Sequence, residues 1–470
     1  MPRIRTSSAP ELLLSVDRTA SEPGHRQVAR GLRDAIRGGR LRSGARLPST
    51  RALARELGVS RGLVVEVYDQ LSAEGYLAIR PGGLTRVART AVRSARAHRA
   101  SEPLTFEIDF RPGRPDVAAF PRDAWLRSMR RSLASAPSSR LTYLDGRGLP
   151  ELRVELANYL NRVRGTAAVP DDIVITVGFA QGIWLVSMAL AEEGARRFAV
   201  EDPSLGDSWR VVEAAGLKVA GIPLDADGLR VDLLEKARVS GVLITPAHQY
   251  PTGRVLSAGR RAALFAWAER RKGVIVEDDY DAEYRYDRQP VGAMQGLRPD
   301  RVVYAGSLSK VLAPGLRLDW LVAPPELAGR IADVKKAMDN GSPIMDQLAF
   351  ADFIARGELD RHLRRMRPIY RRRRDLVVAA LARHLPELQP VGAAAGLHVL
   401  TWLHPTDDPA AIVAAAAQSG IGLGHVEPGT GGDPRSPGGL VFGYGTISES
   451  SIEPGIRRLA RLIDAHGAAA

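Results

Sequence analysis

The sequence predicts an α/β protein made of two parts, a small helical head and a larger region built on a mostly parallel sheet. Three observations predict this division. Almost all of the net charge of +13 lies in the first hundred of the 470 residues. Apolar residues recur there at helical spacing in three short stretches. After residue 108, short apolar runs alternate with helical stretches, the pattern of a parallel sheet covered by helices on both faces.

Composition narrows the class of protein. With 45% hydrophobic and 25% charged residues, the chain is typical of globular proteins. It has no apolar run of roughly eighteen residues or more, and its first residues lack the apolar core of a signal peptide. It has no cysteine, which excludes disulfides and thiolate metal sites. These features predict a cytoplasmic protein without a membrane span.

The positive charge is concentrated in the head. Residues 1–100 carry 19 arginines and no lysine against 8 acidic residues, whereas the other 370 residues are nearly balanced. A local excess of this kind favours a polyanionic partner, either a nucleic acid or an anionic membrane surface.

The head is predicted at residues 21–88, after an N-terminal arm at residues 1–20. Helical periodicity predicts helices at residues 23–37, 50–57 and 61–74, and a hairpin follows at residues 76–87. Three short helices and a hairpin make a winged helix-turn-helix, which favours double-stranded DNA as the partner. The candidate DNA contacts lie at the starts of the second and third helices and at the hairpin tip: Ser49, Thr50, Arg51, Ser60, Arg61, Gly82 and Gly83.

Three short motifs carry a family resemblance in the head. They occur in order as Leu47-Pro48-Ser49-Thr50-Arg51, Gly58-Val59-Ser60-Arg61 and Glu74-Gly75-Tyr76-Leu77. The stretch resembles the GntR-type winged helix of bacterial transcription regulators. An Arg-, Ala- and Ser-rich segment at residues 89–108 is predicted to be a linker.

The larger region is predicted to contain a large domain at residues 109–360 and a small α+β subdomain at residues 361–470. A very basic helix at residues 361–374 opens the subdomain. The predicted strands of the large domain are five short apolar runs, at residues 173–177, 197–200, 242–245, 273–277 and 302–305.

Lys310 is the most informative residue of the large domain. It follows the last predicted strand and lies close to Ser307, Ser309 and Arg317. A lysine amine forms a Schiff base with an aldehyde. Hydroxyls and a guanidinium suit a phosphate group. Pyridoxal 5'-phosphate carries both groups, and these residues therefore predict it as the cofactor.

Other motifs point to the same cofactor. Gly178-Phe179-Ala180-Gln181 follows a strand and opens a helix, where backbone N–H groups bind phosphate. Asp278 ends another strand, and a carboxylate facing a pyridine nitrogen keeps that nitrogen protonated. Tyr280 follows two residues later, and Tyr143 lies in an upstream loop motif.

Residues 108–465 resemble the fold-type I aminotransferases, and their combination with a GntR-type head resembles the MocR/GabR family of regulators, which includes a PdxR-like vitamin B6 branch. The resemblance implies that Lys310 binds pyridoxal phosphate, Asp278 pairs with the ring nitrogen and Tyr280 with the ring hydroxyl. It also implies a homodimer in which Tyr143 reaches the phosphate of the partner subunit. The residues that it places around the phosphate are Gly178, Phe179, Ala180, Gln181, Ser307, Ser309 and Arg317.

The chain departs from the enzyme pattern at four positions. Tyr250 replaces an asparagine, Leu205 stands where related regulators often have a stacking aromatic, and Asp319 replaces a glycine. Val441 stands where an arginine is expected for a substrate carboxylate, and Arg435 in the preceding loop is the nearest substitute.

Three functions remain open. The favoured one is a DNA-binding regulator that senses pyridoxal phosphate itself and controls vitamin B6 metabolism. In the second, the effector is an amino acid or amine captured on the cofactor at Lys310. The third is a working aminotransferase with a DNA-binding head. Val441 and Tyr250 disfavour the third, and we assign no catalytic residue.

Overall fold

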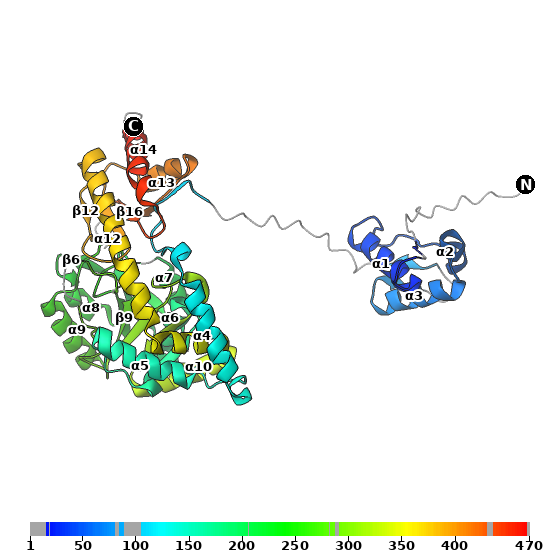
Figure 1. Ribbon diagram of the computed structural model, residues 1–470, viewed down its shortest axis with the longest axis horizontal. Helices are drawn as coiled ribbons and strands as arrows, with labels where there is room; N and C mark the ends of the chain where they lie inside the picture. The colour runs from blue at the N-terminus through cyan, green and yellow to red at the C-terminus, as the bar shows by residue number, and fades with distance from the viewer. Residues whose placement is uncertain are drawn as a thin grey trace, which may run out of the picture. The chain divides into compact units, whose positions relative to one another are not determined.

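The computed structural model describes residues 16–17, 19–79, 84–88, 105–204, 206–281, 283–286, 291–429 and 436–467. The chain divides into two compact units, Met1–Leu104 and Thr105–Ala470 (Figure 1). Within the described ranges, no helix has the length and apolar character needed to cross a membrane.

The described part of the first unit contains three helices and a two-stranded sheet, as predicted. Helices α1, α2 and α3 pack around a buried core that includes Leu32, Leu53 and Val67. Gly58 has a φ of +64°, a left-handed conformation that turns the chain between α2 and α3. The hairpin tip with Gly82 and Gly83 lies outside the described residues. The element bounds are α1 Gly24–Arg37, α2 Thr50–Leu57, α3 Arg61–Ala73, β1 Leu77–Ala78 and β2 Arg86–Val87.

The second unit is built on an eight-stranded sheet with the order β4-β11-β10-β9-β8-β5-β6-β7. Strand β11 runs antiparallel to both neighbours and β7 antiparallel to β6, while the other pairs are parallel. The predicted mostly parallel sheet is therefore confirmed. The strands are β4 Ile173–Thr176, β5 Arg197–Asp202, β6 Lys218–Asp225, β7 Gly228–Leu229, β8 Gly241–Ile244, β9 Val274–Asp279, β10 Val302–Ser307 and β11 Asp319–Val322.

Helices cover both faces of this sheet (Figure 1). Successive residues of β10 point to opposite faces of the sheet. Val303 packs in one apolar cluster, and Tyr304 packs in another. The helices of this part are α4 Arg122–Ser135, α5 Pro150–Arg164, α6 Phe179–Glu192, α7 Gly206–Ala214, α8 Val231–Ala237, α9 Ala258–Arg271, α10 Pro325–Asp339 and α11 Ile344–Ala355, with short 3-10 turns η1 Val117–Ala119, η2 Ser138–Arg140, η3 Pro170–Asp172 and η4 Pro314–Leu316.

A smaller antiparallel sheet with the order β12-β13-β16-β15 follows the long helix α12. Strand β3 at the start of the unit pairs in parallel with β14 near its end. The segment after residue 108 thus joins the C-terminal subdomain, a long-range pairing that the sequence analysis did not foresee. The bounds are β3 Ile108–Asp109, α12 Glu358–His384, β12 Pro390–Val391, β13 His398–Trp402, α13 Pro409–Gln418, β14 Ile421–Gly422, β15 Gly424–Val426, β16 Gly439–Gly443 and α14 Glu449–Gly467.

A buried ion pair joins the end of α5 to the end of β9. The guanidinium of Arg164 donates to both carboxylate oxygens of Asp279 at 2.7 and 3.1 Å, and Tyr304 donates its hydroxyl to the same carboxylate at 2.8 Å. The Arg164 and Asp279 side chains are only 3% and 2% exposed. Since successive strand residues face opposite sides, this anchor leaves Asp278 on the other side of β9.

Replacing Asp279 with alanine is expected to lower the free energy of unfolding of the second unit by about 3–5 kcal/mol, because Arg164 would keep a buried, uncompensated charge. The exposed pair between Arg162 and Asp360 provides the control, and Asp360→Ala should cost no more than about 1 kcal/mol. Denaturant unfolding of both variants measures the difference. Equal midpoints for the two variants would contradict the prediction.

Candidate functional site

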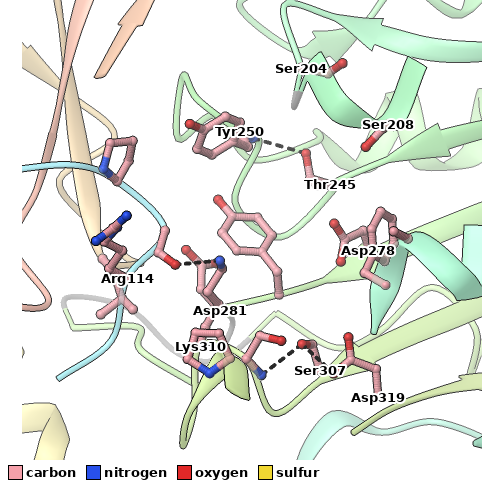
Figure 2. A pocket seen from close by; sticks show the side chains of 18 of the residues that line it. Arg114, Ser204, Ser208, Thr245, Tyr250, Asp278, Asp281, Ser307, Lys310 and Asp319 are labelled. Carbon is pink, nitrogen blue, oxygen red and sulfur yellow. Dashed lines mark hydrogen bonds between the residues drawn. The ribbon is translucent and has the colours of Figure 1, made fainter. Parts of the chain in front are cut away.

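A cavity of about 710 Å³ opens at the carboxyl ends of the central parallel strands. Ligands of open α/β sheets commonly bind at this edge. Figure 2 shows Lys310 between Arg114 on one side and Asp278 and Asp319 on the other. Of the residues predicted to bind the cofactor, the cavity is lined by Lys310, Asp278, Tyr280, Ser307, Ser309, Arg317, Phe179 and Ala180.

Lys310 extends into the cavity after the end of β10. Its Nζ donates a hydrogen bond to the carbonyl oxygen of Gly113 at 2.6 Å. Burial lowers the pKa of Lys310, although the carboxylates of Asp278, Asp281 and Asp319 oppose this shift. A lowered pKa increases the share of neutral amine, which is the nucleophilic form.

Asp278 faces the cavity from the end of β9 and is half-buried. Burial raises the pKa of Asp278 well above its ordinary value, and the neighbouring Asp279 and Asp281 raise it further. The charge of Lys310 acts in the opposite direction. A cationic group bound beside Asp278 would therefore stabilise the ionised carboxylate.

One end of the cavity presents hydroxyls and a guanidinium beside the start of α6. We call this end the anion cup; it consists of the side chains of Ser307, Ser309 and Arg317 and the first helical residues Phe179 and Ala180. Positive charge and helix N-terminal N–H groups both favour an anion here.

Gly178 makes room for the guanidinium of this cup. Arg317 donates from Nη2 to the carbonyl oxygen of Val177 at 2.6 Å. A Cβ on Gly178 would lie 2.0 Å from that Nη2, and the φ of Gly178 is +109°. Gly178 does not line the cavity, but glycine is the residue that permits the approach of Arg317.

Gln181 does not belong to the cup, contrary to the expectation from the sequence. Its Oε1 accepts from Val177 N and Lys335 Nζ at 2.9 and 3.2 Å, and its Nε2 donates to Asp339 at 2.8 Å. Each helical residue turns by about 100°, so Gln181 points away from the side of α6 that Ala180 presents to the cavity. Tyr143 also lies away from the cavity and is 84% exposed.

A hydrogen-bonded cluster that sequence reasoning missed lies beside Lys310. His248 Nδ1 lies 2.9 Å from Asp281 Oδ2 and 3.1 Å from the hydroxyl of Tyr280. Its Nε2 lies 3.2 Å from the carbonyl oxygen of Gly392, and His398 Nε2 lies 3.2 Å from that of Pro251. The cluster therefore holds Tyr280 at the cavity wall. Of the residues in this cluster, the sequence analysis singled out only Tyr280.

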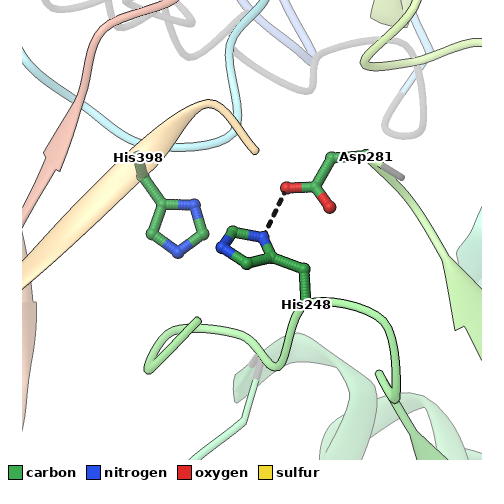
Figure 3. Close-up of side chains that lie close together, drawn as sticks. All are labelled: His248, Asp281 and His398. Atoms are coloured by element: carbon green, nitrogen blue, oxygen red, sulfur yellow. Dashed lines mark hydrogen bonds and ion pairs between the residues drawn. The ribbon is translucent and has the colours of Figure 1, made fainter. Parts of the chain in front are cut away.

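The same cluster has the spacing of a metal site. Potential ligand atoms of His248, Asp281 and His398 lie within 4.8 Å of one another (Figure 3). Both nitrogens of His248 and one of His398 already have protein partners, so the arrangement is satisfied without an ion. Burial lowers the pKa of His398 to about 3. Burial also acts to lower the pKa of His248, but Asp281 outweighs it and raises that pKa.

The positions that depart from the enzyme pattern fall in different places. Tyr250 and Asp319 line the cavity. Val441 is buried against Leu400 and Val426 in the small sheet, outside the cavity lining. Arg114, which the sequence analysis did not single out, contributes an exposed guanidinium to the cavity. Leu205 and Arg435 lie outside the described residues.

The predicted DNA contacts lie at two helix starts in the first unit. Ser49 and Ser60 cap α2 and α3, and each hydroxyl oxygen accepts from a backbone N–H three residues later at 3.2 Å. Thr50 opens α2, and Arg51 and Arg61 are exposed in the first turns of α2 and α3. Capped helix starts flanked by arginines suit phosphate and base contacts.

Two family models match the chain. The model described as bacterial regulatory proteins of the gntR family matches residues 25–87, and the model described as aminotransferase class I and II matches residues 108–427. Both resemblances drawn from the sequence motifs are therefore confirmed.

Three relatives match almost the whole chain. They are the uncharacterized HTH-type transcriptional regulator YhdI of Bacillus subtilis (34% identical, 94% of this chain and 96% of that protein), the pyridoxine biosynthesis transcriptional regulator PdxR of Corynebacterium glutamicum (33%, 93% and 94%) and the probable rhizopine catabolism regulatory protein MocR of Rhizobium meliloti (32%, 95% and 95%).

Solved structures of aminotransferases share the fold of the second unit. An archaeal alanine:glyoxylate aminotransferase is 28% identical with a TM-score of 0.69, over 78% of this chain and 92% of that one. LysN, the α-aminoadipate aminotransferase of Thermus thermophilus, is 25% identical with a TM-score of 0.68, over 77% and 93%. The structure of LysN contains N-(5'-phosphopyridoxyl)-L-leucine.

Gly178→Ala is expected to destabilise the second unit by about 1–3 kcal/mol more than Gly194→Ala, because its methyl group would displace Arg317. Gly194 is the matched control, since its φ is +94° and an added Cβ there would meet nothing within 4 Å. Both variants place an alanine at a positive φ, and only Gly178→Ala adds the collision with Arg317. Thermal or denaturant unfolding measures the difference, and equal losses would rule out the collision.

Proposed function

Because the chain belongs to the family of HTH-type transcription regulators in which a gntR-type domain precedes an aminotransferase class I and II domain, we propose that its second domain binds pyridoxal 5'-phosphate as a sensor cofactor or effector. When bound, pyridoxal phosphate supplies an aldehyde that forms a Schiff base with a lysine amine. DNA binding by the first domain then reports the state of the second.

The observation that carries this proposal is the placement of three different groups in one cavity. Lys310 offers an amine whose pKa is lowered, and Asp278 offers a carboxylate to a ring nitrogen. The anion cup offers hydroxyls, a guanidinium and a helix start to a phosphate. The fit is supported by Gly178, because any larger residue there would collide with Arg317.

The proposed signal is pyridoxal phosphate itself, and the proposed process is vitamin B6 metabolism. The relative from Corynebacterium glutamicum, named as a regulator of pyridoxine biosynthesis, supports this assignment. The position expected to hold a substrate carboxylate is Val441, which packs in the small sheet against Leu400 and Val426. A sensor of the cofactor alone does not need such a clamp.

A second candidate is a regulator in which an amine or amino acid joins the cofactor. The cavity favours it in one respect, since its lining also includes Ser204, Ser208 and the guanidinium of Arg114. An arginine there could bind a ligand carboxylate. A change in the absorption of bound cofactor with one member of a panel of amines would favour this candidate.

We also propose a homodimer. Tyr143 is 84% exposed and the nearby Leu141 is 53% exposed, which leaves an aromatic and an aliphatic side chain uncovered beside η2. A second copy of the chain would cover these two side chains. Tyr143 of one copy would then reach the anion cup of the other copy.

The protein incubated with pyridoxal phosphate and then with borohydride is expected to gain the mass of one reduced pyridoxal phosphate adduct on Lys310. Lys310→Ala should abolish the adduct and the absorption of bound cofactor, because no other residue among those described in the cavity lining carries an amine. Lys336→Ala, which removes an exposed lysine of α10, is the control and should leave both unchanged. An adduct at Lys335 or no adduct at all would contradict the assignment.

Pyridoxal phosphate is expected to change the affinity of the protein for the DNA upstream of its own gene. An electrophoretic mobility shift with and without the cofactor measures the change, and transcription from that promoter provides the second readout. Arg61→Ala should weaken the complex by about tenfold or more if the start of α3 contacts DNA, whereas Arg127→Ala on α4 should not. Identical binding and identical promoter output with and without cofactor would contradict a sensor role.

A further inference from the structure

The carboxylate of Asp319 lies at the anion cup, where negative charge opposes the binding of a phosphate. Asp319 is the first residue of β11 and is 2% exposed. In the sheet it lies opposite Ser307 of β10 and Thr176 of β4. The hydroxyl of Ser307, which is one of the donors of the cup, donates to Asp319 Oδ1 at 2.9 Å. An acidic side chain thus already uses a donor that a phosphate would need.

The second oxygen of this carboxylate is unsatisfied. Within the described part of the chain, Asp319 Oδ2 is buried and has no hydrogen-bond partner. A buried ionised oxygen without a partner is costly, and protonation relieves the cost. Burial accordingly raises the pKa of Asp319 to about 6. The hydrogen bond from Ser307 and the charge of Arg317 act to lower that pKa, as do the backbone amides of Leu308 and Phe179.

The charged groups that face Asp319 come from three directions. Arg317, at the end of η4, provides the nearest positive charge and is exposed. Lys310 lies beyond β10 and Asp278 ends β9, and Asp319 acts to raise the pKa of both. The start of α6 contributes a backbone amide and β4 contributes the hydroxyl of Thr176, neither of which carries a charge. The exposed guanidinium of Arg317 is therefore the positive charge that acts most directly on the carboxylate at the cup.

We propose that Asp319 is an internal competitor for the phosphate group of the ligand, so that the cup binds phosphate tightly only when this carboxylate is protonated or displaced. This inference rests on the proposed binding of pyridoxal phosphate. When ionised, Asp319 repels the phosphate and keeps the hydrogen bond that the hydroxyl of Ser307 donates. When protonated, it carries a donor on the oxygen that now lacks a partner. The consequence is a ligand that exchanges readily and whose binding takes up a proton.

The test compares the whole protein with Asp319→Asn, which keeps the shape and the acceptor for Ser307 and removes the charge. At pH 8, we expect Asp319→Asn to bind pyridoxal phosphate about tenfold or more tightly than the unsubstituted chain, as measured by absorbance or fluorescence titration. Pyridoxal, which has the aldehyde and no phosphate, should bind both proteins equally. Asp333→Asn on α10 removes an exposed charge and should change neither affinity.

The pH profile separates a charge effect from a change in packing. Between pH 7 and 8.5 the phosphate is already dianionic, since its second pKa is about 6. Over this range, binding of pyridoxal phosphate to the unsubstituted chain should weaken with rising pH by up to about tenfold per pH unit relative to pyridoxal. The same ratio should be flat for Asp319→Asn. Asp319→Gly, which also removes the charge, serves as the second variant if the asparagine disturbs folding.

The possible outcomes test separately whether Asp319 competes with the phosphate and whether pyridoxal phosphate is the ligand. Equal affinities and equal pH profiles in the two proteins would overturn the role of Asp319 and leave the cofactor in place. If neither protein binds pyridoxal phosphate, the cofactor is wrong, and inorganic phosphate becomes the probe of the cup. Tighter binding of inorganic phosphate by Asp319→Asn would then support the competitor, whereas equal or undetectable binding would overturn it.

Discussion

The buried pair of Arg164 and Asp279 is the interaction on which the geometry of the site depends. Strand β9 ends in three consecutive acidic residues, and burying three such side chains side by side is unfavourable unless each is compensated. Glu277 accepts hydrogen bonds from the backbone N–H of Met294, and Asp279 binds Arg164. With both neighbours held on one side of the strand, Asp278 is the carboxylate that faces the cavity.

Burial controls the chemistry of that cavity. It lowers the pKa of Lys310 and raises those of Asp278 and Asp319, so each group is shifted toward its neutral form. A ligand with a cationic ring nitrogen and an anionic phosphate would act in opposite directions at the two ends. It would supply Asp278 with an opposite charge, which lowers the pKa of that carboxyl, and Asp319 with a like charge, which raises the pKa of that carboxyl further. Ligand binding is thereby linked to proton binding at more than one residue.

Local pattern predicts local structure in this chain, and it fails where distant residues meet. Helical periodicity predicted α2 at its observed bounds and α3 at its observed start, Arg61. The pairing of β3 with β14 joins segments some three hundred residues apart, so no local pattern reveals it. Gln181 was misplaced because a helix start predicts backbone N–H groups near an anion but does not fix which side chains turn away. The sequence of three adjacent acidic residues does not show which of them forms an ion pair with a distant arginine, as Asp279 does with Arg164.

Two departures from the enzyme pattern, at Val441 and Asp319, fit the proposed sensing role better than catalysis. Catalysis of amino transfer needs a substrate held in one orientation. Val441, where the resemblance to aminotransferases led us to expect an arginine, is buried in the small sheet outside the cavity lining. A sensor needs occupancy that follows the concentration of its ligand, which requires binding that is not effectively permanent. In the proposed arrangement, Asp319 would weaken the binding of the phosphate group, while Lys310 and Asp278 would still bind the aldehyde and the ring. Under the proposed function, the chain retains the residues that recognise the ligand, Lys310 and Asp278. It lacks the features that would hold the ligand permanently and orient a substrate for catalysis.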